Sequence, residues 1–335
     1  MKFALNRLDM SGPLAFAESA ARIEDLGWHM GLMPCNPLKA PDPYLSLAFA
    51  AQATITLHLG TLLDTPVLRH PSVLAGSIST VAQMAPGRVH LGLGIGDTAV
   101  RFNGLSPATV QSLEDATRTT RSLLAGDSLD VRALRRASLD RANAVPVWIA
   151  AQGPKTLRMA GRVADGVWIR VGTHPANLIN AWTSVCHGAR EVGRDPKDIL
   201  LGLIFHTIVS RDRDRARTIG KAIAAGYYEY SPFLFDAPGF QWSGKAAHVL
   251  SESVWPDFHH HKDLVHAGTV VDFLDDDIAD AFAMHGDWDQ IGTQLKSLLE
   301  LGLPVSIVLP HPIVPLDELV DFIAECAQRL LPAFI

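Results

Sequence analysis

The 335-residue sequence contains few cysteines, no long apolar run and no excess of positive charge. Its three cysteines, Cys35, Cys186 and Cys326, form no CxxC pair, which argues against a disulfide framework and against a zinc ribbon. Charged or turn residues interrupt each apolar stretch, and the N-terminus lacks the apolar core of a signal peptide. We therefore expect a cytoplasmic protein without a membrane span.

The charge balance argues against nucleic acid and anionic membranes as partners. Lysine and arginine number 29 against 35 aspartates and glutamates, a formal net charge of −6. Both kinds of partner attract a basic surface. With 48% hydrophobic and 19% charged residues, the composition is typical of a folded globular protein. Only a local basic patch could provide for such partners.

Short apolar runs alternate with longer amphipathic ones along most of the chain. The predicted strands are Phe3 to Leu5, 28–33, 56–63, 88–93, 145–151, 166–171, 199–209 and 303–309. The predicted helices include Pro13 to Leu26, 43–53, 71–84, 107–125, 154–164, 175–192 and 315–331. Alternating strands and helices pair in parallel, so eight such units predict an α/β fold, a single (β/α)₈ TIM barrel. A doubly wound open sheet is the alternative.

One segment, at about 227–266, interrupts this alternation before the last strand. We interpret it as an insertion in one domain that spans 1–335, placed where it could cover the mouth of a barrel. The alternative is that this segment has only a structural role. Its aromatic residues either favour an apolar substrate or fill a core; they are Tyr227, Tyr228, Tyr230, Phe233, Phe235, Phe240 and Trp242.

Three segments at predicted strand ends carry polar or small residues. Asp64 and Thr65 follow the third strand, where they could hydrogen-bond a polar ring system, although Asp64 and Pro66 also suit a structural turn. Three glycines, Gly92, Gly94 and Gly96, precede Asp97, a candidate acid or base. Their GxGxG spacing is not the dinucleotide-binding GxGxxG pattern.

The third segment joins a buried strand to a helix. Ala150, Ala151 and Gly153 lead to Pro154, which suits the first turn of a helix. The free amides of that turn, beside Lys155, could bind a phosphate. The histidines at 259–261 have neighbouring side chains that point in different directions, and no HExxH pair accompanies them, so we predict no metal site.

Taken in order, these segments resemble the bacterial luciferase-like superfamily of flavin- and F420-dependent barrel enzymes, and within it the methylenetetrahydromethanopterin reductase-like branch. The similar segments are Arg69 to Ala82, Gly87 to Gly96, Pro146 to Gly166, Gly188 to Pro196 and 273–282. The resemblance implies an oxidoreductase or monooxygenase that uses F420 or reduced FMN on a mostly apolar organic molecule. It is also compatible with a homodimer.

The resemblance also implies roles for individual residues. A non-prolyl cis peptide at Leu62–Leu63 would support the cofactor ring, with Asp64 and Thr65 at its polar edge. Gly94, Gly96 and Asp97 would flank the reacting face. The residues implied beside the cofactor tail and phosphate are Ala150, Ala151, Gly153, Pro154, Arg170 and Thr173.

The sequence departs from this pattern at the end of the second strand. Many F420-using relatives carry an Asp-His pair there, whereas this chain has Met33-Pro34-Cys35-Asn36. Asp97 and Asp64 are then the acid/base candidates, and Cys35 and Asn36 could line the same space. A family member that binds cofactor without catalysis and a metal-dependent barrel hydrolase are the alternatives.

Overall fold

The computed structural model describes residues 1–131 and 135–334. Clustering of contacts divides the chain into two compact units. Unit 2 comprises residues 2–168 and 184–202, and unit 1 comprises residue 1 with 169–183 and 203–335. The prediction of one domain over 1–335 includes residues 132–134 and 335, which lie outside the described residues, and it stays a prediction.

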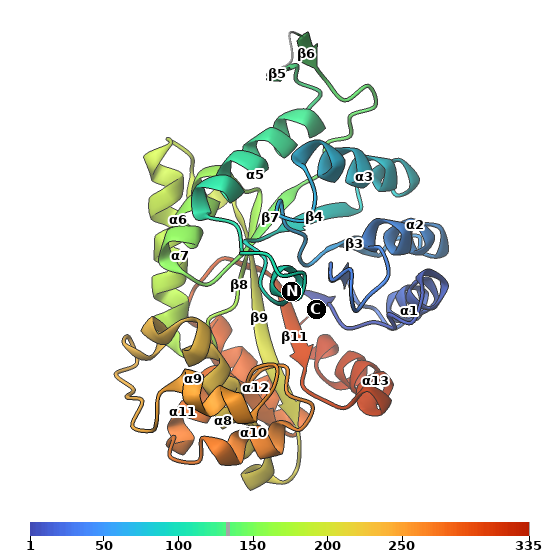
Figure 1. Ribbon diagram of the computed structural model, residues 1–335. Coiled ribbons are helices and arrows are strands. Elements are labelled where there is room, and N and C mark those ends of the chain that lie inside the picture. Colours follow the sequence, from blue (N-terminus) through green and yellow to red (C-terminus); the bar gives the residue numbers. More distant parts are fainter. Residues whose placement is uncertain (132–134, 335) are drawn as a thin grey trace. The chain divides into compact units, whose positions relative to one another are not determined.

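Unit 2 contains a parallel sheet with helices along its outer side (Figure 1). The strand order is β1-β2-β3-β4-β7-β8. These strands are β1 (Lys2–Leu5), β2 (Met30–Met33), β3 (His58–Thr61), β4 (Val89–Leu93), β7 (Val147–Ala151) and β8 (Gly166–Ile169). The helices are α1 (Pro13–Asp25), α2 (Pro43–Ala53), α3 (Pro71–Met84), α4 (Thr98–Arg101), α5 (Val110–Leu124) and α6 (Pro154–Val163). Helix α7 (Pro175–Glu191) belongs to unit 1 up to Thr183 and to unit 2 from Ser184. A small hairpin, β5 (Leu129–Val131) with β6 (Arg135–Ala137), follows α5.

Unit 1 contains strands in the order β10-β9-β11. These are β9 (Leu200–Val209), β10 (Met284–Gly286) and β11 (Val305–Pro312). The helices are α8 (Arg213–Tyr230), α9 (Ala247–Leu250), α10 (Leu264–Val270), α11 (Asp276–Phe282), α12 (Trp288–Leu299) and α13 (Leu319–Arg329). Together with those of unit 2, these strands and helices confirm the predicted class, an α/β protein with a (β/α)₈ barrel.

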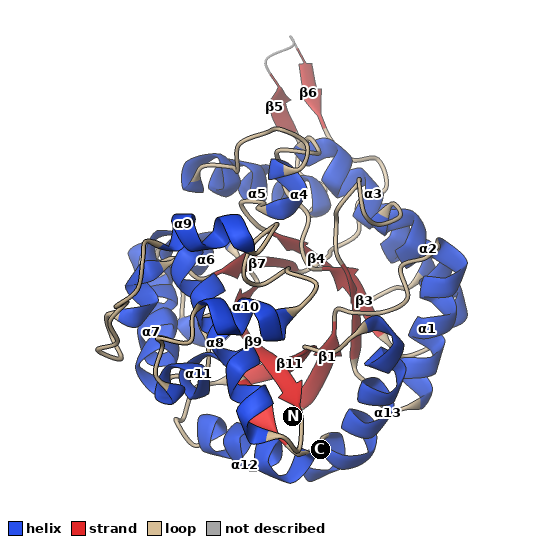
Figure 2. Ribbon diagram, turned by 60° about the horizontal axis from the view of Figure 1, so that its bottom comes forward, coloured by secondary structure: helices blue, strands red, loops and turns tan. Residues whose placement is uncertain are grey.

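Proline marks where several helices begin. Helices α1, α2, α3, α6 and α7 each start at a proline, whose missing N–H needs no partner in a first turn. Figure 2 shows these helices in blue. Asp42 caps α2 by accepting hydrogen bonds from the amides of Tyr44 and Leu45, both at 3.0 Å. These local signals explain why the predicted helix starts at 13, 43, 71, 154 and 175 agree with the structure.

Several predicted boundaries were wrong, each for a local reason. The strand predicted at 166–171 ends at Ile169, because Gly172 has a φ of +80°. The helix predicted from 107 begins at Val110, because the Thr109 hydroxyl caps it through the amide of Ser112. Strand β10 was not predicted, since its three residues gain their extended form only by pairing with Thr207 to Val209.

The helix α8 runs to Tyr230, beyond the start predicted for the irregular segment at 227. The aromatic residues of the segment pack largely on one another. Tyr228 stacks on Trp242 with ring centroids 4.3 Å apart, and Phe235 stacks on Phe282 at 5.1 Å. Tyr227 and Phe235 are buried, whereas Phe233 is 38% exposed. These contacts favour the core alternative for most of the aromatic residues.

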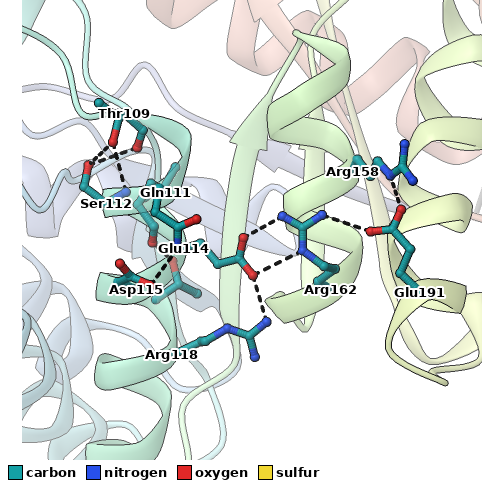
Figure 3. A network of polar contacts seen from close by, with 11 residues as sticks. Thr109, Gln111, Ser112, Glu114, Asp115, Arg118, Arg158, Arg162 and Glu191 are labelled. Atoms are coloured by element: carbon teal, nitrogen blue, oxygen red, sulfur yellow. Dashed lines mark hydrogen bonds and ion pairs between the residues drawn. The ribbon is translucent and has the colours of Figure 1, made fainter.

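Ion pairs join the outer helices α5, α6 and α7 of unit 2 (Figure 3). The carboxylate of Glu114 is 7% exposed and accepts from Arg118 and Arg162. Arg162 also donates to Glu191. The guanidinium groups hold the pKa of Glu114 below its usual value, chiefly through the hydrogen bond from Arg162. Within the described residues, no helix has both the length and the apolarity needed to cross a membrane.

Candidate active site

The chain forms a bulge between β3 and its neighbour β4. The Thr61 hydroxyl donates to the Gly92 carbonyl at 2.9 Å and accepts from the Gly92 amide at the same distance. Three residues further on, the Asp64 amide donates to that same carbonyl at 2.9 Å. The peptide bond between Leu62 and Leu63 is cis, as the family resemblance implied. The bulge therefore turns the chain so that Asp64 lies directly beside β4.

The glycines at the end of β4 make room for this bulge. A Cβ atom at Gly94 would lie 2.8 Å from a methyl carbon of Leu63, and one at Gly92 would meet the Thr61 carbonyl. Gly96 has a φ of +78°, a conformation that side chains disfavour. The close approach of the β3 bulge thus explains why glycine occupies these positions at the end of β4. The roles of Gly94 and Gly96 beside a cofactor stay predictions.

Asp64 is buried and holds three polar partners. Its Oδ2 atom accepts from the Tyr44 hydroxyl at 2.8 Å, and its Oδ1 atom accepts from the Thr65 amide at 2.7 Å. The Arg69 guanidinium lies 3.3 Å from Oδ2. Burial outweighs these contacts and raises the pKa of the Asp64 carboxyl above its ordinary value. The arrangement fixes the carboxylate and couples it to α2 and to the loop before α3.

Asp42, Tyr44 and Arg69 complete what we call the Asp64 cluster. Arg69 forms an ion pair with Asp42 and lies over the ring of Tyr44, with 5.0 Å from Cζ to the ring centroid. Sequence reasoning did not assign these three residues to the site. A Pro that follows Asp42 marks a helix start, but no sequence signal shows that this helix points Tyr44 at Asp64.

The loop after β2 supplies Cys35 and Asn36. Burial, followed by the charge of Asp64, raises the pKa of the Cys35 thiol far above its ordinary value, so the residue stays protonated. The main-chain carbonyl of Asn36 accepts from the amides of Lys39 and Ala40, which fixes the loop. Its side-chain Oδ1 atom is buried without a hydrogen-bond partner in the described structure. An unpaired buried acceptor is costly, so this atom suits a ligand N–H group.

Asp97 lies at the start of the short helix α4. Its side chain is 43% exposed and accepts from Arg101 Nε at 2.8 Å. The preceding residue, Gly96, approaches Thr65, because a Cβ atom there would lie 3.1 Å from the Thr65 hydroxyl oxygen. Asp97 is therefore anchored close to the bulge, and its catalytic role stays a prediction.

The junction between β7 and α6 contains the segment predicted to bind a phosphate. Ala151 ends β7, Gly153 precedes α6 and Pro154 is its first residue. No side chain caps this helix, so amides of its first turn are available to an anion. Strand β7 pairs with β4 through Leu93 and Ile149, which brings Ala150 and Ala151 to the carboxyl end of the same sheet.

Two predicted phosphate partners, Arg170 and Thr173, belong to unit 1 and have partners there. The Thr173 hydroxyl donates to the carbonyl of Asp280 at 2.9 Å, and its amide donates to the carbonyl of Ala281 at 2.8 Å. Arg170 Nη2 lies 3.3 Å from His259 Nδ1. Their roles toward a cofactor stay predictions. In the residues that the structure describes, no group of three or more His, Cys, Asp or Glu side chains is placed to hold a metal ion.

A (β/α)₈ barrel with polar side chains at the carboxyl ends of its strands is typical of a barrel enzyme. The chain belongs to the luciferase-like monooxygenase family, whose sequence model matches residues 5–304. It is similar to a 5,10-methylenetetrahydromethanopterin reductase of Methanolobus tindarius, with 28% identity over 286 residues that cover 83% of this chain and 84% of the relative. The family resemblance and the oxidoreductase class predicted from the sequence are confirmed.

Two further relatives support the same assignment. An F420-dependent glucose-6-phosphate dehydrogenase of Beutenbergia cavernae is 33% identical over 196 residues, covering 54% of this chain and 57% of the relative. The solved structure of the coenzyme F420 dependent tetrahydromethanopterin reductase of Methanopyrus kandleri has a TM-score of 0.79. The two sequences are 24% identical, and the match covers 100% of this chain and 99% of the relative. The latter similarity agrees with the barrel fold.

Proposed function

We propose that this protein is an F420-dependent oxidoreductase that acts on a small, mostly apolar organic molecule. The observation that carries the proposal is the position of the Asp64 cluster at the carboxyl ends of β2 to β4 in a chain that belongs to this family. Barrel enzymes build their active sites at that end of the strands. The F420-dependent relative from Beutenbergia cavernae supports the choice of cofactor.

The residues present fit a flavin-type ring with a phosphate-bearing tail. The buried Asn36 Oδ1 atom offers an acceptor to a ring N–H, and the uncapped first turn of α6 offers amides to a phosphate. When bound, the cofactor supplies the hydride. The protein would bind and orient it: the Leu62–Leu63 bulge would support the ring, and Asp64 would hold Tyr44 and the Thr65 amide in place.

Reduced FMN is the second candidate cofactor, because the family model describes monooxygenases. Such a reaction consumes oxygen and requires a pocket that excludes water, whereas direct hydride transfer requires no oxygen. The absence of an Asp-His pair after β2 also keeps open a third candidate, a family member that binds cofactor without turnover.

A parallel titration of the purified protein with F420 and FMN, followed by absorbance and fluorescence, tests the proposal. Tight binding of F420 and weak binding of FMN are expected. Preferential FMN binding would replace the proposal by the monooxygenase candidate, and oxygen consumption would then be measured. Binding of neither cofactor would contradict both. We also propose a cytoplasmic location and a homodimer, the latter to be checked by light scattering on the eluting protein.

A further inference from the structure

A second group of polar side chains lies within unit 1, apart from the residues assigned above to the cofactor ring. Three histidines and a tyrosine face one another: the ring centroid of His206 is 5.1 Å from that of His259, 5.3 Å from that of His311 and 5.5 Å from that of Tyr227. Arg170 lies over the Tyr227 ring, with 5.6 Å from Cζ to the centroid. We call these five residues the Arg170 cluster.

The Arg170 cluster contains two buried polar groups with unused hydrogen-bonding capacity. His206 is 3% exposed, and its Nδ1 atom has no partner among the described residues. Tyr227 is fully buried; its hydroxyl oxygen faces the Gly172 amide, but its proton has no acceptor among the described residues. Folded proteins pair nearly all buried polar atoms, because each unpaired one costs free energy. These two groups can therefore bond a polar group from outside the chain.

Arg170 gives the cluster a positive charge that the described chain does not neutralise. Within the described residues, its guanidinium forms no ion pair with a carboxylate, and Nη2 lies 3.3 Å from His259 Nδ1. His259 Nε2 donates to the carbonyl of Ile223 at 2.8 Å, which leaves Nδ1 as the acceptor for Arg170. Asp257, on the same loop, is already bound by His260 at 2.8 Å.

The histidines of the cluster add hydrogen-bonding capacity without adding charge. Burial, followed by electrostatic coupling to His259 and Arg170, lowers the pKa of His206 well below its ordinary value. Burial and Arg170 do the same for the pKa of His259, and burial raises the pKa of Tyr227 to about 12. Near neutral pH His206, His259 and Tyr227 are therefore neutral, and the Arg170 guanidinium beside them is charged.

We propose that the Arg170 cluster binds the carboxylate group of a small organic molecule. A guanidinium matches a carboxylate in shape and can donate two parallel hydrogen bonds to it. The Tyr227 hydroxyl can donate a further bond, and so can His206 in the tautomer that protonates Nδ1. A single cation balances a carboxylate, whereas a phosphate at neutral pH carries more negative charge. This proposal stands without the proposed redox function, and it gives Arg170 a carboxylate in place of the cofactor phosphate predicted for it.

The same chemistry could accept a phosphate, as the sequence suggested for Arg170, so the test compares the two anions. The full-length protein, labelled with ¹⁵N-histidine, is titrated with sodium acetate and separately with inorganic phosphate at pH 7.5 and constant ionic strength. The His206 side-chain signal is assigned from the spectrum of His206→Gln. We expect acetate to shift this signal saturably and phosphate to bind at least about threefold more weakly.

Variants then locate the site. Arg170→Met should weaken acetate binding at least about tenfold and Tyr227→Phe about fivefold, because each removes a donor to the charged group. Arg170→Lys should retain part of the affinity. Arg211→Met removes an exposed arginine of the same unit and should leave binding unchanged. Thermal unfolding of each variant verifies that it folds.

The proposal fails if acetate produces no saturable shift in the wild-type protein. It also fails if Tyr227→Phe binds acetate as tightly as the wild type does, or if phosphate binds more tightly than acetate. Should Arg170→Met not fold, the wild-type titration and Tyr227→Phe still decide the outcome.

Discussion

The hydroxyl of Tyr44 donates a hydrogen bond to Asp64 Oδ2 at 2.8 Å, and neither side chain is open to solvent. Tyr44→Phe removes this donor and leaves a buried carboxylate with one partner fewer. We expect the free energy of unfolding to fall by about 1–3 kcal/mol, the usual cost of an unsatisfied buried group. Urea unfolding measures it, with Tyr228→Phe as the matched control. Equal stability of Tyr44→Phe and the wild type would show that water replaces the hydroxyl.

Asp64→Asn keeps the shape of the side chain and removes its charge. The Thr65 amide and the Tyr44 hydroxyl would then be held by a neutral group, which forms weaker hydrogen bonds. We expect affinity for the cofactor to fall about tenfold, since a charged hydrogen bond contributes roughly 1.5–3 kcal/mol. Cofactor titration checks this, and Asp115→Asn, on the surface of α5, should bind as the wild type does. Unchanged affinity in Asp64→Asn would remove Asp64 from the cofactor site.

Asp97→Ala tests the predicted acid or base. The side chain is 43% exposed and pairs with the exposed Arg101, so stability should change by less than about 0.5 kcal/mol. Turnover should fall by about a hundredfold if Asp97 transfers a proton. Steady-state kinetics at saturating cofactor provide the measurement, with Arg101→Ala to separate loss of the ion pair from loss of the carboxylate. Full activity in Asp97→Ala would exclude the role.

The buried, neutral state of His90 predicts that the protein loses stability in mild acid. Trp148 Nε1 donates to His90 Nδ1 at 3.2 Å, and His90 Nε2 lies 2.8 Å from His58 Nδ1, so the ring is held neutral between a donor and an acceptor. Burial, followed by the charge of His58, lowers the pKa of His90 to about 3. Below a pH of about 6.5, His90 binds a proton in the unfolded chain but stays neutral in the folded chain. The contribution of His90 to stability is therefore complete above that pH and is lost as the pH falls below it.

The expected loss between pH 6.5 and pH 5 is about 2 kcal/mol for this one residue. Urea unfolding at pH 7 and at pH 5 should show a smaller difference for His90→Gln than for the wild type, by about that amount. An equally steep pH dependence in the variant would mean that other groups carry it.

Glu114 connects α5 to α6, and its replacement probes the ion network of Figure 3. Glu114→Gln leaves Arg118 and Arg162 without their carboxylate, so we expect a loss of about 1 kcal/mol in the free energy of unfolding at low salt. The loss should shrink in 1 M NaCl, which screens the wild-type pairs. Glu18→Gln, on an exposed position of α1, serves as the control. A loss that does not depend on salt would point to packing instead of charge.

The sequence by itself determined the alternation of strands and helices, and with it the barrel class and the family. Those features are local: a proline at position 43, 71 or 154 starts a helix regardless of what packs against it, and an apolar run of five residues needs no distant partner to favour a strand. Asp64 and Asp97 could be singled out for the same reason, because each follows such a run. The short strand β10 could not be predicted from the sequence, since only pairing with β9 makes it extended.

The tertiary structure alone decided which side chains meet. Tyr44 reaches Asp64 across 20 positions of the chain, and Arg170 reaches His259 across 89. No residue type or spacing encodes such a contact, because it depends on how whole elements pack. The same holds for the environment that sets a pKa: His90 and His206 differ from the exposed His70 in burial, which a sequence of letters does not record.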